Sequence, residues 1–261
     1  MRNLFFGVIA LVILFSSPAL AADFPKQATY LIYVAQKPVG KSVVQIEQTG
    51  KSVIFTSENL TETADFYQQL KCRTEIDRET FRAKRFQYEG RQNDQIIDGE
   101  VWSEGPVFKG HINIDGNSFP SEKPGIGLAL FYQNYVIDNQ IAWLHAVVNA
   151  ERGMLNFSAI LPSDFMFNGV SAFVESELEV RTPKGPRICA KVQFTLEGST
   201  TFWGYLDLDT GIAIYFDYPQ QGTEVFLVDA YGEKPTPKYT TDTPDNASDH
   251  DDHDDHEGHN H

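Results

Sequence analysis

Recognisable catalytic motifs are missing from this sequence. Its 261 residues contain no Gly-x-Ser-x-Gly nucleophile elbow, no phosphate-binding P-loop, no dinucleotide-binding glycine pattern and no zinc-protease helix. These absences exclude the enzyme classes that short motifs identify and favour a non-catalytic protein over an enzyme. A hydrolase with unrecognised residues is kept as a third hypothesis.

Basic residues are scarce as well. Lys and Arg number 21 against 36 Asp and Glu, which gives a formal net charge of -15. An acidic surface without a basic cluster repels phosphate backbones. Nucleic acid is therefore excluded as an expected partner.

No hydrophobic run is long enough to cross a bilayer, for which about 20 apolar residues are needed. The apolar run Leu4–Phe15 follows Arg2 and precedes the small-residue site Ala19-Leu20-Ala21. This pattern predicts a signal peptide over residues 1–21, cleaved between Ala21 and Ala22. The mature chain is expected to be periplasmic or secreted and not membrane-spanning.

The sequence has only two cysteines, Cys72 and Cys189. In an oxidising compartment such a pair is readily bridged, so a disulfide between them is predicted. The alternative, two separate buried thiols that behave as small hydrophobic side chains, stays open.

Aromatic residues, by contrast, are plentiful, with 19 Phe and 11 Tyr. Together with many Val and Thr residues they favour strands. Turn signals recur about every 8–12 residues, as in an antiparallel meander. They include the segments 37–40, 49–50, 105–106, 183–185 and 209–211. An antiparallel β domain is therefore predicted over residues 22–232.

One segment interrupts this pattern. Between Ile126 and Arg152 no proline occurs, and apolar residues take helical spacing at Ile137, Ile141, Leu144 and Val148. We expect a helix over residues 139–151, with Asp138 or Asn139 as its N-cap. The predicted fold class is mainly β: a long, curved, half-barrel-like antiparallel sheet with one central helix. Two halves meeting near residue 125 are an alternative to a single unit.

Several hairpin residues carry a family resemblance. Thr182-Pro183-x-Gly185 turns into Cys189-x-Lys191-Val192, and Phe202-Trp203-x-x-Leu206 leads to Asp209-Thr210-Gly211. With the Val39-Gly40 turn, this arrangement resembles bacterial exported β proteins of unknown function and is similar to half-barrel periplasmic lipoprotein carriers. The resemblance implies a curved sheet over about residues 28–230 and an apolar concavity, and it implies no catalytic residue. The lipidation cysteine of the outer-membrane receptor member is missing here.

Aromatic residues near the helix suggest a ligand pocket between helix and sheet, lined by Phe131, Tyr135, Trp143, Phe165 and Phe167. The alternative is that they are core residues. His145 is expected to be a core or rim histidine, with a proton-transfer pair with Asp138 as the alternative. Glu175, Glu177 and Glu179 alternate along one strand, which is typical of a solvated face.

The C-terminal segment 233–261 is predicted to be disordered and metal-binding. Residues 242–261 contain eight acidic residues and no Lys or Arg. Neutral imidazoles bind Zn, Ni or Cu, and carboxylates add oxygen ligands. The candidate ligands are His250, His253, His256, His259, His261, Asp251 and Asp254. The alternative is a solvated acidic tail that binds metal only incidentally.

Two function hypotheses follow. The first is a non-catalytic periplasmic binding protein for an apolar or lipid-like envelope ligand, with a metal-binding tail. The second is a protein that handles divalent metal (Zn, Ni or Cu) through the tail.

Overall fold

The computed structural model describes residues 26–238, apart from residue 126 and residues 198–200. The predicted signal peptide and all seven candidate metal ligands lie outside the described residues. Within them, the chain forms one 15-stranded sheet in the order β8-β7-β6-β5-β4-β3-β2-β1-β15-β14-β13-β12-β11-β10-β9. The predicted fold class, mainly β with one long antiparallel sheet, is confirmed.

The sheet has two runs of strands in which strands consecutive in sequence are also neighbours in the sheet. The first comprises β1 (Gln27–Val34), β2 (Lys37–Gln48), β3 (Ser52–Glu62), β4 (Tyr67–Asp77), β5 (Ala83–Gln92), β6 (Gln95–Glu104), β7 (Val107–Ile114) and β8 (Asn117–Pro124). The second comprises β9 (Ala129–Phe131), β10 (Met154–Leu161), β11 (Met166–Thr182), β12 (Gly185–Leu196), β13 (Thr201–Asp207), β14 (Ala213–Tyr218) and β15 (Thr223–Leu227). Antiparallel pairing of β1 with β15 joins the two runs.

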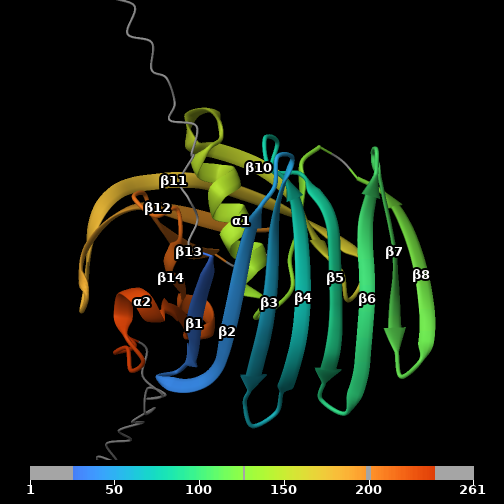
Figure 1. Ribbon diagram of the computed structural model, residues 1–261, viewed down its shortest axis with the longest axis horizontal. Coiled ribbons are helices and arrows are strands. Elements are labelled where there is room, and N and C mark those ends of the chain that lie inside the picture. The colour runs from blue at the N-terminus through green and yellow to red at the C-terminus, as the bar shows by residue number, and fades with distance from the viewer. Residues whose placement is uncertain (1–25, 126, 198–200, 239–261) are drawn as a thin grey trace, which may run out of the picture.

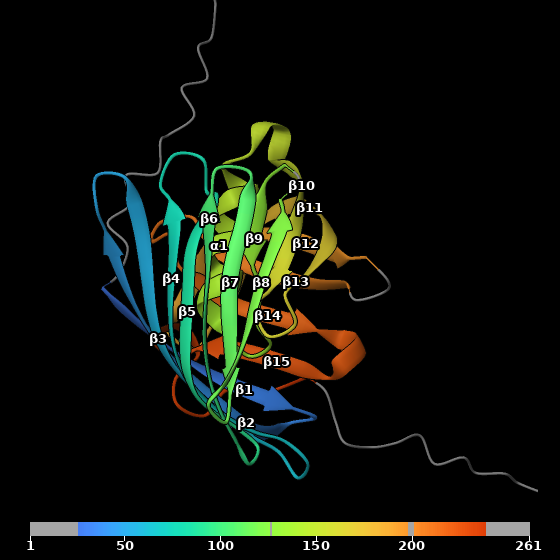
Figure 2. The same cartoon turned by 90° about the vertical axis from the view of Figure 1, so that its right-hand side faces the viewer.

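The two runs enclose the helix. Figures 1 and 2 show β10–β15 running across the direction of β3–β8, with α1 (Ile137–Val148) between them. Every residue of α1 from Ile137 to Val147 is buried. At Gly204 on β13 an added Cβ would lie 2.7 Å from Leu144 Cδ2, so the missing side chain lets the helix approach the sheet closely.

The helix differs from its prediction at both ends. It begins at Ile137 rather than residue 139, ends at Val148 rather than 151, and has Val136 as an N-cap without a side-chain hydrogen bond. Asp138 and Asn139 do not cap it, because both side chains bond to Thr74 on β4 instead. A separate 3-10 turn, η1 (Glu151–Gly153), follows.

Two strands were missed from the sequence. The turn signals named from the sequence do not include residues 115–116, which connect β7 to β8, and β9 lies in the proline-free segment where only a helix was expected. β9 has three residues and pairs in parallel with β10, so alternation cannot reveal it. The last strand, β15, ends at Leu227, and α2 (Val228–Tyr231) follows it.

Prolines protect the free edge at β8. Pro120 opposes His111 and Pro124 opposes Val107 across β7. Because proline has no N–H, these residues occupy positions whose backbone groups face away from β7. Half of the outward-facing positions on β8, at 118, 120, 122 and 124, therefore offer no donor to an incoming strand.

The interior consists of two apolar clusters. The larger contains Trp143, Phe157, Phe194 and Phe202. The smaller lies between β4–β7 and β9–β10 and contains Phe86, Phe108, Phe131, Ile160 and Phe165.

The prediction of a disulfide between Cys72 and Cys189 is wrong, because the two cysteines lie in different apolar clusters. Cys72 on β4 belongs to the smaller cluster and Cys189 on β12 to the larger one, and both are free, buried thiols. A bridge needs Cα atoms within about 7 Å of each other, and these two strands are not neighbours in the sheet. The alternative of two separate buried thiols therefore holds.

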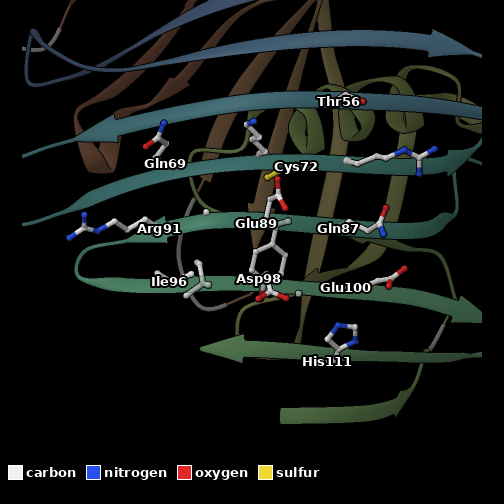
Figure 3. A pocket seen from close by; sticks show the side chains of 16 residues that line it. Thr56, Gln69, Cys72, Gln87, Glu89, Arg91, Ile96, Asp98, Glu100 and His111 are labelled. Atoms are coloured by element: carbon white, nitrogen blue, oxygen red, sulfur yellow. The ribbon is translucent and has the colours of Figure 1, made fainter. Parts of the chain in front are cut away.

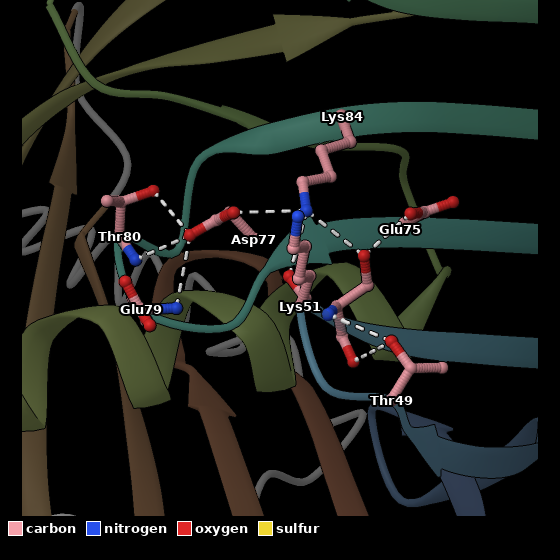
Figure 4. Close-up of polar contacts among 8 residues, drawn as sticks. Thr49, Lys51, Glu75, Asp77, Glu79, Thr80 and Lys84 are labelled. Atoms are coloured by element: carbon pink, nitrogen blue, oxygen red, sulfur yellow. Dashed lines mark hydrogen bonds and ion pairs between the residues drawn. The ribbon is translucent and has the colours of Figure 1, made fainter.

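The ends of β3, β4 and β5 are tied together by polar contacts (Figure 4). Asp77 Oδ1 accepts the N–H groups of Glu79 and Thr80 at 3.1 and 2.9 Å, and Lys84 Nζ lies 3.0 Å from Asp77 Oδ2. The Thr80 backbone bond, followed by the Lys84 bond, holds the pKa of Asp77 well below its usual value. Lys84 Nζ also donates to Ser52 Oγ at 3.0 Å, which in turn donates to Glu75 at 2.7 Å.

Candidate functional site

A small pocket opens beside the first turn of α1. Its volume is about 210 Å³, and we call it the tyrosine pocket. It is lined by Tyr132, Asn134, Tyr135, Ile137, Gln140, Tyr218, Gln221, Thr223 and Val225. The segment before α1, the helix itself and the β14–β15 connection each supply part of the wall, and none of these side chains is charged.

Two buried polar groups in this pocket lack partners. Gln140 is 3% exposed and Tyr218 is 5% exposed. The Gln140 amide lies near enough to the Tyr218 hydroxyl to act on its pKa, yet Gln140 Oε1 and Tyr218 OH have no hydrogen-bond partner among the described residues. Leaving a buried polar group unpaired costs about 1–3 kcal/mol, so a ligand or water that bridges them is favoured.

The ionisation state of the walls follows from burial. Desolvation raises the pKa of Tyr132 to about 12, and it also raises the pKa of Tyr218 well above its usual value. Both phenols are therefore neutral at physiological pH. Burial also raises the pKa of Tyr135. The pocket therefore presents hydroxyls and amides rather than charges.

Tyr135 has an unusual backbone. Its φ is +60°, in the left-handed region that non-glycine residues rarely occupy. Strained residues of this kind concentrate at binding and catalytic sites. Here the conformation turns the chain into α1 and places the Tyr135 ring against Phe66, with 5.8 Å between ring centroids.

The structure separates the five aromatic residues predicted to form one pocket. Tyr135 lines the tyrosine pocket. Phe131 and Phe165 are 2% exposed in the smaller cluster, with Phe167 packed against it, and Trp143 is fully buried in the larger one. Trp143 Nε1 donates to Phe131 O at 2.9 Å, and its ring lies 5.2 Å from Tyr132, behind the pocket wall.

A buried polar layer fixes the first turn of α1. Thr74 Oγ1 donates to Asp138 Oδ2 at 2.8 Å, and Asn139 Nδ2 donates to Thr74 Oγ1 at 2.8 Å. Burial raises the pKa of Asp138 to about 6, although hydrogen bonds from Thr74 and others lower it. Because Gln140 is the next residue, these bonds also position the amide in the tyrosine pocket.

A wider groove of about 890 Å³ lies on the other face of β3–β7 (Figure 3). Its charged side chains come from alternate positions of the strands, and they carry both signs of charge. They include Lys71, Arg73, Arg91, Glu89, Asp98, Glu100 and His111. Arg85 pairs with Glu100 at 2.8 Å and Asn113 donates to Asp98 at 2.6 Å, as expected for a solvated sheet face.

The remaining candidates from the sequence have structural roles. His145 is 2% exposed and its Nε2–H donates to Gly211 O at 2.7 Å. Burial lowers the pKa of His145 to about 4, so the ring is neutral. Glu175, which bonds Lys191 Nζ and Trp203 Nε1 at 2.9 and 2.8 Å, is exposed, as are Glu177 and Glu179.

Within residues 26–238, apart from the gaps, no three His, Cys, Asp or Glu side chains gather to hold a metal ion. In the same ranges, no helix has the length and apolar character needed to cross a membrane. The candidate metal ligands in the tail lie beyond these ranges and stay predictions.

Sequence reasoning missed most of the tyrosine pocket. Tyr132, Gln140, Tyr218 and Thr223 come from segments far apart along the chain. Each is an ordinary residue in its own element, and only the pairing of β14 with β15 brings Tyr218 opposite Thr223. A local pattern could therefore not identify them.

Together, the fold and the site define a β-rich protein with an open sheet, an internal helix and a small neutral pocket. No family model and no curated protein matches the chain. Among solved structures, it is similar to a β-barrel-like protein of the domain of unknown function DUF1849 from Brucella abortus. That match has 12% identity, 78% coverage of this chain, 97% of the other and a TM-score of 0.53.

A DUF1089 family protein from Pseudomonas aeruginosa matches more weakly. It has 12% identity, 69% and 90% coverage and a TM-score of 0.38. The first likeness shows the fold alone, and the second carries no argument. The expected kinship with β-rich proteins of unknown function is supported in outline, whereas the finer resemblance to lipoprotein carriers is not.

Proposed function

We propose that this chain is a non-catalytic binding protein that takes a small, uncharged, ring-sized group into the tyrosine pocket. The observation that carries the proposal is the pair of unpartnered, buried polar atoms, Gln140 Oε1 and Tyr218 OH, at one concavity. An amide oxygen only accepts hydrogen bonds, so the bound group must carry a hydroxyl or NH donor. A charged group would be excluded, because the walls offer no counter-charge.

The pocket size restricts the ligand further. A cavity of 150 Å³ holds a benzene ring, so about 210 Å³ accommodates one substituted ring. An apolar or lipid-like envelope ligand, as the sequence favours, would enter with one uncharged end rather than with an acyl chain. Aromatic side chains of the larger cluster fill the interior beside α1. This packing supports entry of one uncharged end rather than of a whole acyl chain. A periplasmic or secreted location is part of the proposal and rests on the signal-peptide pattern.

Metal handling by the tail is the second candidate. It is favoured by the recurrence of histidine at every third position from His250 to His259, with carboxylates between them. The sequence order places this tail after Lys238, the last described residue.

Native mass spectrometry of the mature, untagged protein distinguishes the two candidates. The full-length chain is compared with a form cut after Lys238. A small organic molecule retained on both forms supports the binding proposal. Zn²⁺ on the full-length form alone, with no organic molecule on either, would make metal handling the primary function.

A further inference from the structure

The segment that follows α2 lies over the face of the sheet opposite α1. We call residues 232–238 the strap. Pro235 is buried in it, whereas Glu233, Lys234, Thr236 and Lys238 are exposed. This segment was expected to belong to a disordered tail beginning at 233. Every residue of β14 and β15 is buried, so both faces of these strands are covered.

Beneath the strap lies a surface that is both acidic and aromatic. Asp217 and Glu224 are directly opposite each other on β14 and β15. Next to them, Tyr215 and Phe226 are also cross-strand partners, with ring centroids 5.1 Å apart. Tyr231 of α2 completes the cluster at 5.1 Å from Phe226 and 6.0 Å from Tyr215.

Lys238 fastens the strap to the two carboxylates. Its backbone N–H donates to Glu224 Oε2 at 2.6 Å, and its Nζ donates to Asp217 Oδ2 at 3.1 Å. The same ammonium lies 4.9 Å from the centre of the Tyr215 ring. One residue therefore supplies a cation, a backbone donor and a cation–π contact to a surface that carries two adjacent carboxylates.

The composition of the strap indicates how it is recognised. Lys234-Pro235-Thr236-Pro237-Lys238 combines prolines, which favour an extended backbone without internal hydrogen bonds, with cationic residues. Aromatic surfaces commonly dock such extended, proline-containing segments. The strap thus resembles a peptide ligand that happens to be part of the same chain.

We infer that the strap is a displaceable cover, and that the surface beneath it docks an extended, proline-containing segment of a partner protein that carries a lysine or arginine. We expect a cationic partner, because Lys238 places its ammonium against Asp217 Oδ2 and over the Tyr215 ring, and a lysine or arginine of the partner would take that position. The inference goes beyond the proposed function and is independent of it, since Tyr215, Asp217 and Glu224 point away from the face that holds the tyrosine pocket.

A peptide with the sequence of residues 232–239 tests the inference in trans. In the wild-type full-length chain the attached strap has a high effective concentration and competes with the peptide. Lys238→Glu removes the cation and adds a third carboxylate, which releases the strap. The labelled peptide should bind this variant at least tenfold more tightly than the wild type, as measured by fluorescence polarisation. Lys234→Glu, a charge reversal at an exposed strap residue, is the matched control and should leave the wild-type affinity unchanged.

Two results would overturn the inference. One is equal affinity, or no binding, for wild type and Lys238→Glu. The other is hydrogen exchange in wild-type strap amides as slow as in β15, which would make the strap a fixed part of the core. Unchanged tryptophan fluorescence verifies that the variant is folded, and Lys238→Ala replaces it where the charge reversal prevents folding.

Discussion

Replacing Asp138 with asparagine should stabilise the protein at neutral pH and have little effect near pH 4. Asp138 is fully buried on the first turn of α1, and its carboxylate accepts a hydrogen bond from Thr74 at 2.8 Å. Asparagine has nearly the same shape and keeps an oxygen for that bond. The substitution therefore removes the ionisable proton and little else.

The size of the effect follows from the shift in pKa. Burial raises the pKa of Asp138 from 3.8 to about 6, so the folded protein holds this proton more tightly than the unfolded chain. As pH rises from about 4 to about 6, the unfolded chain ionises first and the free energy of unfolding falls. Two pKa units correspond to about 3 kcal/mol. Asp138→Asn should recover up to that amount at pH 7.5.

Burial of His145 changes the free energy of unfolding in the opposite direction over nearly the same pH range. Burial lowers its pKa from 6.5 to about 4, so the unfolded chain gains a proton first as pH falls. Stability from neutral His145 is therefore lost between pH 6.5 and 4. In the wild type the two trends oppose each other. In Asp138→Asn only the His145 trend remains, and the variant should lose stability steadily toward acid pH.

Urea unfolding followed by Trp fluorescence at pH 4.5, 6 and 7.5 measures both curves. We expect the free energy of unfolding of Asp138→Asn to exceed that of the wild type by an amount that grows as pH rises. A gap that stays constant over the three pH values would refute the burial of an ionisable Asp138. His145→Gln is the matched control, and its stability should fall with rising pH.

Four further outcomes are expected. Tyr218→Phe should stabilise the ligand-free protein by about 1 kcal/mol in urea unfolding, because it removes an unpartnered buried hydroxyl, and a loss of stability would contradict that view. Pro120→Val should restore an outward N–H on β8 and cause concentration-dependent association in light scattering, whereas scattering equal to that of the wild type would show that the prolines do not protect this edge. Thiol titration without reductant should find both Cys72 and Cys189 in urea and neither in the folded protein, since a missing thiol signal in urea would mean a bridge. Asp77→Asn should weaken stability in full above about pH 4, and the deficit should shrink progressively as pH falls toward the lowered pKa of the folded state, because the ionised carboxylate makes the bonds; an equal deficit at pH 2.5 would argue against it.

The parts of the fold that local patterns encode were predictable. Long strands such as β3 alternate buried and exposed residues, and the three- and four-residue spacing around Ile141 revealed α1. The exact start of α1 was not predictable, because Asp138 and Asn139 look like caps in sequence but bond to Thr74, which lies 64 and 65 residues away. The strap was missed for a similar reason. Its Lys–Pro composition is that of a linker, whereas contacts with Glu224, Asp217 and Tyr215, which are distant in sequence, hold Lys238 against the sheet.

Of the residues that line the tyrosine pocket, the sequence predicted only one, Tyr135. Tyr135 was named from its place in an aromatic-rich stretch, whereas Phe131, Trp143 and Phe165 from the same stretch are core residues. Which aromatic side chains face a cavity depends on how the two runs of strands close over the helix, and no single segment contains that information.

Calorimetric titration of the full-length protein with phenol, benzene and benzoate tests the binding proposal most directly. Phenol is an uncharged ring with a donor, benzene lacks the donor, and benzoate is charged. We expect phenol to bind best and benzoate not to bind. Tyr218→Phe should lose phenol affinity at least fivefold, while Tyr67→Phe, a control at a half-buried tyrosine outside the tyrosine pocket, should keep it. Equal binding of phenol by wild type and Tyr218→Phe, or tighter binding of benzoate, would contradict the tyrosine pocket as the ligand site.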